Sequence, residues 1–95
     1  MKSFYVYILA KGRNEALYVG MTSDLPGRVW QHKNNLVKGF TSKYGIHTLV
    51  YYEGPTEFES AVKREKQLKH WNRQWKMRII EQMNPEWKDL YDTLT

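Results

Sequence analysis

Aromatic and β-branched residues open the chain in two short runs, which are separated by a polar segment rich in turn-forming residues. Such runs favour strands, and two of them joined in this way are typical of a β-hairpin. We therefore predict a first strand from about Ser3 to Leu9 and a second from about Ala16 to Met21. Alternation along the first strand would place Tyr5 and Tyr7 on one face of the sheet and Val6 on the other.

Apolar side chains recur with the spacing of a helix after the hairpin. Asp24 is the predicted N-cap, and Pro26 is acceptable because it lies in the first turn. This helix is predicted to end at about Lys33 or Asn35. The segment Lys38–Gly45, which includes a glycine near each end, is predicted to be a loop.

A third strand is predicted from Ile46 to Glu53, and Gly54-Pro55 should end it. Thr56 is followed three residues later by Glu59, a capping-box pattern that predicts the start of another helix.

The last third of the chain predicts two further helical segments. Asn72 would cap a helix from Arg73 to Met83, with Trp75 and Met83 among its inward side chains. Asn84-Pro85 resembles a cap followed by a proline at the first helical position, and it predicts a last short helix.

The predicted order, β-β-α-β-α-α, indicates a small α+β fold. The first two strands must be antiparallel, and the third is expected to join the same sheet. A length of 95 residues indicates a single domain, residues 1–95.

Composition narrows the possible functions. The chain contains no cysteine, which excludes disulfides and thiolate metal sites. No signal-peptide pattern is present, and no run approaches the roughly 20 apolar residues of a membrane span. We therefore expect a cytoplasmic protein without a membrane partner.

The net charge is +5, and Lys and Arg are concentrated between residues 63 and 78, where Glu65 is the only acidic residue. A basic segment that also contains Trp71 and Trp75 suits the phosphate backbone of a nucleic acid. The alternative is a solvated helix face. For both tryptophans, core packing is the interpretation that we favour.

Glu65 is an unusual residue for its predicted place. Ala61, Glu65 and Leu68 share one helical face, so the carboxylate lies on or beside the apolar side. A buried acid is costly unless it is paired or binds a metal. Two explanations remain open: an ion pair with Arg28 or Lys69, or a ligand for a hard divalent cation.

Arg28 and His32 are four residues apart and therefore lie on one helical face. They could belong to an ordinary amphipathic helix. They could also bind a phosphate through the guanidinium and exchange protons through the imidazole.

Tyrosines of the hairpin form the third set of candidates. Tyr5, Tyr7 and Tyr18 could be core residues with satisfied hydroxyls. A phenol could instead act as a general base if positive neighbours lowered its pKa from about 10.

Taken together, Tyr5-Val6-Tyr7, Tyr18-Val19-Gly20, Arg28, His32 and Glu65 resemble the GIY-YIG nuclease superfamily. The resemblance is to its small, single-domain bacterial members of the UPF0213 type, and it covers nearly the whole chain. One residue departs from the pattern, because Tyr5 stands where the family has its first glycine.

The resemblance implies a three-stranded antiparallel sheet flanked by helices, and an endonuclease that hydrolyses DNA phosphodiester bonds with one Mg²⁺ or Mn²⁺. Glu65 would hold the metal. Tyr7 or Tyr18 would help to deprotonate the attacking water, and the other would position the water or the phosphate. Arg28 would neutralise charge on the phosphate, and His32 would assist by hydrogen bonding or proton transfer.

Further contacts are implied around this set. The predicted nucleic-acid-binding residues are Lys43, Lys66, Lys69 and Arg73. A polar residue that often follows the metal-binding glutamate in the family, commonly Asn, could be Asn72 or Asn84.

Two functions are compatible with these residues. One is a metal-dependent DNA endonuclease in repair or defence, either alone or as a homodimer. The alternative is a nucleic-acid-binding module of the same fold with little or no cleavage activity. The complete polar set favours the enzyme, because an acidic residue at Glu65 would repel phosphate on a surface meant only for binding.

Overall fold

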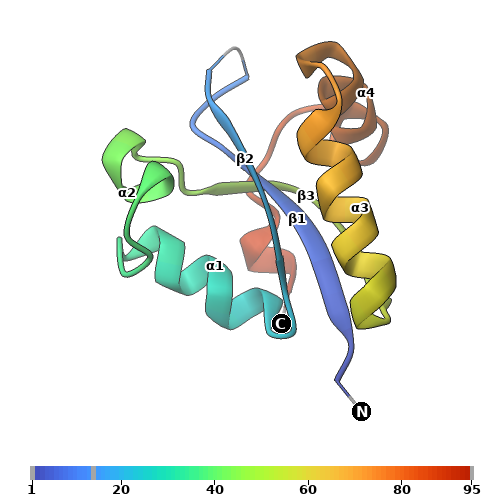
Figure 1. The fold of residues 1–95 in the computed structure, drawn as a ribbon. Coiled ribbons are helices and arrows are strands. Elements are labelled where there is room, and N and C mark those ends of the chain that lie inside the picture. The colour runs from blue at the N-terminus through green and yellow to red at the C-terminus, as the bar shows by residue number, and fades with distance from the viewer. Residues whose placement is uncertain (1, 14, 95) are drawn as a thin grey trace.

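The computed structural model describes residues 2–13 and 15–94, and within them three antiparallel strands form a sheet with helices on both faces (Figure 1). The strands are β1 (Phe4–Ala10), β2 (Leu17–Thr22) and β3 (Thr48–Thr56), in the spatial order β2-β1-β3. The helices are α1 (Leu25–Lys33), α2 (Phe40–Tyr44), α3 (Phe58–His70), α4 (Arg73–Met83) and the 3₁₀ helix η1 (Leu90–Thr93). The predicted α+β class and the three-stranded antiparallel sheet are confirmed.

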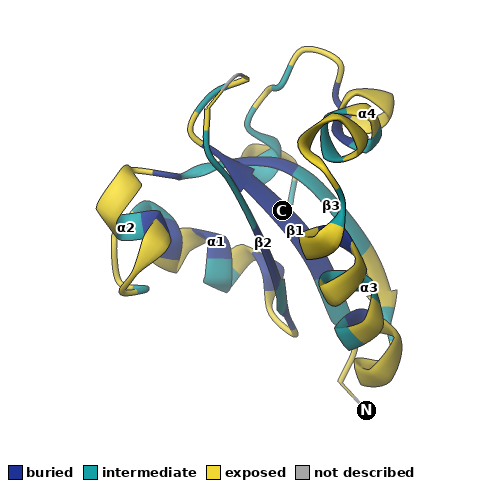
Figure 2. Cartoon of the chain, turned by 45° about the horizontal axis from the view of Figure 1, so that its top comes forward, coloured by how far each residue is buried: buried dark blue, intermediate teal, exposed yellow. Residues whose placement is uncertain are grey.

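Strand β1 is central, and its side chains supply two separate cores. Val6 and Ile8 pack with Ala61 of α3 and Ile80 of α4 on one face. On the opposite face Tyr7 belongs to a second core that includes residues of α1, with η1 packed against it. Figure 2 shows β1 buried along most of its length between these layers. The predicted alternation of side chains along the first strand therefore divides the core in two.

The predicted helix after the hairpin is α1, and its cap is as expected. The Asp24 side chain accepts a hydrogen bond from the Gly27 backbone N–H, and Pro26 lies in the first turn. Across residues 2–13 and 15–94, no helix combines the length and the apolar character that crossing a membrane requires.

The segment Lys38–Gly45 is not wholly a loop, because it contains α2. Gly39 and Gly45 border this short helix with φ angles of 114° and 64°, a region that glycine enters without strain. Thr41, on its inner side, is buried. Five residues give too little periodicity to predict a helix from the sequence.

Strand β3 is displaced from its predicted bounds, Ile46–Glu53. It continues through Gly54-Pro55, a cis peptide, to Thr56. Because β3 is an edge strand, a proline without an N–H is tolerated there. The predicted capping box is wrong, because the N-cap of α3 is Glu57 and makes no side-chain cap hydrogen bond.

Asn72 caps α4 as predicted, with its side chain accepting a hydrogen bond from the Trp75 backbone N–H at 2.9 Å. Trp75 and Met83 are exposed, so their predicted inward positions are wrong. Trp71 does pack partly against the core. Trp71 is the C-cap of α3, and Trp75 lies in the first turn of α4.

Asn84 does not start a helix. Its buried side chain donates hydrogen bonds to the Val50 carbonyl at 3.2 Å and the Lys88 carbonyl at 2.7 Å. Asn84 therefore ties the end of α4 to β3 and to the chain that follows, and the helical turn forms only later, in η1.

Candidate functional site

Tyr7 lies across from Gly20 in the β1–β2 pair. A Cβ at Gly20 would come within 2.5 Å of the Tyr7 hydroxyl oxygen and 3.1 Å of a Tyr18 ring carbon. The absent side chain therefore leaves the space that the Tyr7 phenol occupies. The Tyr7 and Tyr18 ring centroids are 6.3 Å apart, so both predicted tyrosines meet at this glycine.

His32, near the end of α1, is fully buried against the two tyrosines. Its Nε2 lies 3.0 Å from the Tyr7 hydroxyl oxygen, and its Nδ1 lies 2.9 Å from Oγ1 of Thr41. Both ring nitrogens are thus engaged, and the imidazole connects β1 to α2. Sequence reasoning did not find Thr41, because the helix that positions it gave no recognisable signal.

Burial, chiefly, and then the Arg28 and His47 charges lower the pKa of His32 to about 4. The imidazole is therefore neutral at pH 7. A neutral ring has one nitrogen that donates and one that accepts, which suits a position between two hydroxyl groups.

The pKa of Tyr7 is raised, first by burial and then by Tyr18 and Glu65, and Arg28 only partly opposes this effect. The expected lowering of a tyrosine pKa is therefore not found for Tyr7. Its phenol is protonated at neutral pH and has a hydrogen to donate.

Arg28 and Glu65 approach this tyrosine from different elements. Arg28 lies on α1, one turn before His32, and is partly buried. Glu65 lies on α3, which packs on the other face of the sheet (Figure 1). Both charges nevertheless act on the Tyr7 phenol. Helices on opposite faces of the sheet therefore each supply a charge that influences the Tyr7 pKa.

The Glu65 side chain is 20% exposed, and its carboxylate forms an ion pair with Lys69 at 3.6 Å. Of the two predicted ion-pair partners of Glu65, Arg28 and Lys69, it is Lys69 that pairs with the carboxylate. The Lys69 side chain is half exposed, and an (i, i+4) ion pair with one partner in solvent is weak. The carboxylate therefore stays accessible to a competing cation.

In the described part of the chain, no three His, Cys, Asp or Glu side chains form a group that could hold a metal ion. A dense cage for Ca²⁺ or Zn²⁺ is not built from these residues. Mg²⁺ is commonly bound by one or two carboxylates, waters and substrate phosphates. The partly exposed Glu65 carboxylate fits that second kind of site.

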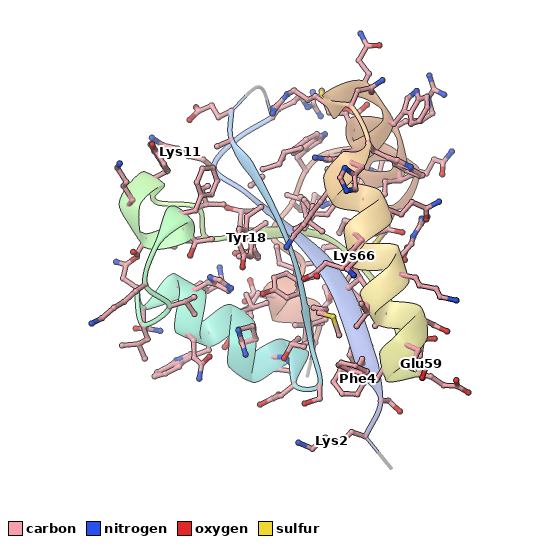
Figure 3. The ribbon with its side chains drawn as sticks, in the orientation of Figure 1. Lys2, Phe4, Lys11, Tyr18, Glu59 and Lys66 are labelled. Atoms are coloured by element: carbon pink, nitrogen blue, oxygen red, sulfur yellow. The ribbon has the colours of Figure 1, made fainter. Side chains whose placement is uncertain are left out.

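The predicted nucleic-acid contacts are spread over three helices. Lys66 and Lys69 lie on α3, and Figure 3 shows Lys66 between α3 and β2, on the opposite side of β2 from Tyr18. Lys43, on α2, places its ammonium 5.4 Å from the Tyr44 ring centre. Arg73 donates a hydrogen bond to the Arg13 carbonyl at 3.0 Å, so it also holds the hairpin to α4.

Both candidate asparagines already have structural partners. Asn72 caps α4, and Asn84 bonds the backbone of β3 and of the following segment. Neither side chain belongs to the group of Tyr7, Tyr18, His32 and Thr41, which we call the Tyr7 cluster.

Comparisons with known proteins find a matching family model and several similar chains. The family model described as the GIY-YIG catalytic domain matches residues 3–78. A UPF0213 protein of Staphylococcus epidermidis is 34% identical over 82 residues, which cover 86% of this chain and 99% of that one. A UPF0213 protein of Clostridium perfringens is 37% identical over 76 residues, which cover 80% and 81% of the two chains.

A solved structure has the same fold. The solution NMR structure of a UPF0213 protein from Bacillus halodurans superposes with a TM-score of 0.56 at 26% sequence identity, over 98% of both chains.

Proposed function

The chain belongs to the GIY-YIG family, among its UPF0213 members, and from this premise we propose that it is a metal-dependent endonuclease that hydrolyses DNA. The family is one of nucleases, so the substrate class is nucleic acid. The observation that carries the finer proposal is the Tyr7 hydroxyl. It is held between Gly20 and His32 and is acted on by Arg28 and Glu65.

Tyr7 and His32 would work as one proton-transfer unit. A phenol with a raised pKa is a poor base alone, because it keeps its own proton. If the hydroxyl donates to Nε2 of neutral His32, its oxygen can accept a proton from the attacking water while its own hydrogen moves to Nε2. Burial disfavours the imidazolium that this transfer forms, so the step would require the negative charge of the bound phosphate nearby. The transfer needs the tautomer in which the Nδ1–H donates to Oγ1 of Thr41, and the hydroxyl of Thr41 can accept that hydrogen bond.

Two other side chains would orient and stabilise the reacting groups. Tyr18, beside both Tyr7 and His32, would position the water or the phosphate. Arg28 would bind the phosphate oxygens and offset the charge that grows on them, because a guanidinium stays charged at any pH of interest.

Glu65 would hold a divalent cation, Mg²⁺ or Mn²⁺, once its carboxylate releases Lys69. When bound, such an ion supplies Lewis-acid stabilisation of the phosphate and of the leaving oxygen. Lys43, Lys66, Lys69 and Arg73 would contact the DNA backbone.

One observation favours the second candidate, a binding module without cleavage. Lys69 partly neutralises Glu65, which would otherwise repel phosphate in the basic surface of α3. In that case the Tyr7 cluster would have a structural role, and binding would not need a metal.

A cleavage assay separates the two functions. Wild type, Glu65→Gln and Arg28→Ala would be incubated with single-stranded, duplex and branched DNA and with RNA, in Mg²⁺, Mn²⁺ or EDTA. Glu59→Gln, an exposed acid on the same helix, is the matched control. We expect metal-dependent cutting by wild type and Glu59→Gln, and a loss of at least about 100-fold in the other two variants. Tight, salt-sensitive binding by wild type without cutting would instead favour the binding module.

A further inference from the structure

Helix α2 has an outward aromatic pair, Phe40 and Tyr44, which are four residues apart and therefore on the same side of the helix. Their side chains are 47% and 45% exposed, and their ring centroids are 4.9 Å apart. Thr41 of the same helix is buried against His32. The contact that fixes the imidazole thus also fixes the position of the exposed pair.

The pair continues the candidate active site. The Phe40 ring stacks on Tyr18, with centroids 6.5 Å apart and 25° between the planes. Tyr18 in turn lies 5.4 Å from the His32 ring. Figure 3 shows Tyr18 on the side of β2 that faces α2. A continuous row of rings therefore leads from the imidazole to the surface.

Single exposed aromatic residues are common on protein surfaces and need no explanation. This pair differs because it adjoins a polar cluster and has a cation beside it. The Lys43 ammonium lies 5.4 Å from the Tyr44 ring centre. Exposed rings next to a positive charge are what proteins use to bind single-stranded nucleic acid, with bases on the rings and phosphates on the cation.

We propose that Phe40 and Tyr44 form a stacking site for an unpaired nucleobase next to the phosphodiester at Tyr7, with Lys43 contacting a neighbouring phosphate. The inference deepens the proposed function and rests on it for the position of the phosphodiester. The occupant is an unpaired base because a base inside a duplex has both faces covered by its neighbours. The stacking energy is the same in kind for every base, so the site selects for strandedness and not for sequence.

A second aromatic pair, Trp71 and Trp75, suits this role less well. Trp71 and Trp75 meet edge to face at 5.8 Å, and the Arg64 guanidinium lies 5.0 Å from the Trp71 ring centre. Trp71 follows α3 and Trp75 lies on α4, and among the described residues no ring contact joins either of them to Tyr18. Trp75, which is 49% exposed, therefore serves as a control.

Binding in EDTA tests the inference without catalysis. The probe is a short single-stranded DNA with 2-aminopurine, whose fluorescence falls when it stacks, and a duplex of the same sequence is the comparison. We expect Phe40→Leu and Tyr44→Leu to weaken single-strand binding by roughly 5- to 100-fold and to remove the quenching. Duplex binding should stay within about twofold of wild type, because stacking of a free base does not contribute to it. Phe40→Tyr and Trp75→Leu should behave as wild type. Trp30, on α1 and 50% exposed, gives a further control, and Trp30→Leu should also behave as wild type.

Single abasic positions placed along the strand give an independent test on the wild-type protein. An abasic residue at one particular position should weaken binding by wild type about as much as Phe40→Leu weakens binding of the intact strand. The Phe40→Leu variant should bind the intact strand and that abasic strand equally. Equal affinity for every abasic strand, or equal losses on single strand and duplex, would overturn the stacking site.

The two proposals fail separately. A wild type that cuts DNA while Phe40→Leu binds like wild type would leave the nuclease proposal intact and reject the stacking site. A wild type that quenches 2-aminopurine through Phe40 but cuts no substrate would reject the nuclease proposal and keep the stacking site.

Discussion

The contact between Tyr7 and Gly20 is the smallest unit on which the candidate site depends. The hairpin register puts the glycine opposite the tyrosine, and the phenol fills the place of its missing side chain. A glycine inside a strand is otherwise unfavourable, so its presence here is explained by this close approach.

Gly20→Ala should therefore displace the Tyr7 phenol from His32. The new methyl group would lie 2.5 Å from the hydroxyl oxygen, which is too close for any contact. We expect a loss of about 1–3 kcal/mol in the free energy of unfolding, measured in urea. DNA cleavage should fall by at least tenfold at a pH where the variant is folded.

Gly12→Ala is the matched control, because its methyl group would meet only the Glu15 carboxylate at 3.4 Å, on a side chain that can move. Normal cleavage by Gly20→Ala would show that the position of the Tyr7 hydroxyl is not critical.

His32 should make stability depend on pH. Its pKa is about 4 when folded and close to 6.5 when unfolded, so between these values the unfolded chain binds more protons. The free energy of unfolding should therefore fall as pH drops from about 6.5 to about 4, by about 3 kcal/mol from this residue.

Urea unfolding of wild type and His32→Gln at several pH values measures this contribution. The variant should be less stable at pH 7.5, and its acid-dependent loss should be smaller by the amount assigned to the imidazole. Identical pH slopes for the two proteins would contradict a buried, neutral His32.

Individual residues were predictable to the extent that their chemistry shows in spacing. The tyrosines, Arg28 and His32 stand at recognisable intervals, and the meeting of Tyr7, Tyr18 and His32 follows from a hairpin followed by a helix. Thr41 was not predictable, because its role depends on a contact across two elements. The raised pKa of Tyr7 also needed the structure, since burial, not the nearby charge, dominates it.

Helix α1 positions both Arg28 and His32, so its first turn matters to the site. Asp24→Ala removes the side-chain acceptor for the Gly27 N–H and should cost about 1 kcal/mol of stability. Asp24→Asn keeps an acceptor and should stay within a few tenths of a kcal/mol of wild type. Thermal unfolding measures the difference, and Ser23→Ala, an exposed neighbour, serves as the control.

The positions of elements with a clear periodic pattern were predicted well, and those of short or irregular elements were not. The strands of the hairpin and helices α1 and α4 lie close to their predicted bounds. Helix α2 was missed, because it is short and is stabilised by the burial of Thr41. Strand β3 was misplaced, because proline usually ends a strand and the edge position that permits it is a tertiary feature.

The whole molecule carries a net charge of +5, which should make DNA binding strongly dependent on salt. Lys66 is exposed on α3 beside β2 (Figure 3), so Lys66→Ala should reduce the slope of log affinity against log salt by about one. Lys88→Ala is the matched control, since that lysine is exposed and paired with Glu86. Fluorescence anisotropy at several KCl concentrations gives both slopes. A slope equal to that of wild type would place Lys66 outside the DNA path.

The arrangement of the sheet could not be derived from sequence, because strand order depends on long-range pairing. With β1 in the centre, α1 and α3 pack on opposite faces of the sheet, and Arg28 and Glu65 both influence the pKa of the Tyr7 phenol. The division into one domain, the choice of DNA over RNA, the identity of the metal, a homodimer, a cytoplasmic location and a role in repair stay predictions.

Asp89 lies beyond the segment that matches the family model, yet its contacts hold the end of the chain on the fold. Its carboxylate pairs with Lys33 of α1 and accepts the Leu49 backbone N–H of β3 at 3.2 Å. Leu90 and Tyr91 then cover the core that contains Tyr7. A chain cut after Arg78 would keep every candidate catalytic residue but expose that core. The candidate catalytic residues therefore span less of the chain than a stable fold requires. A domain excised from a longer chain on the basis of this signature should also include residues 79–94.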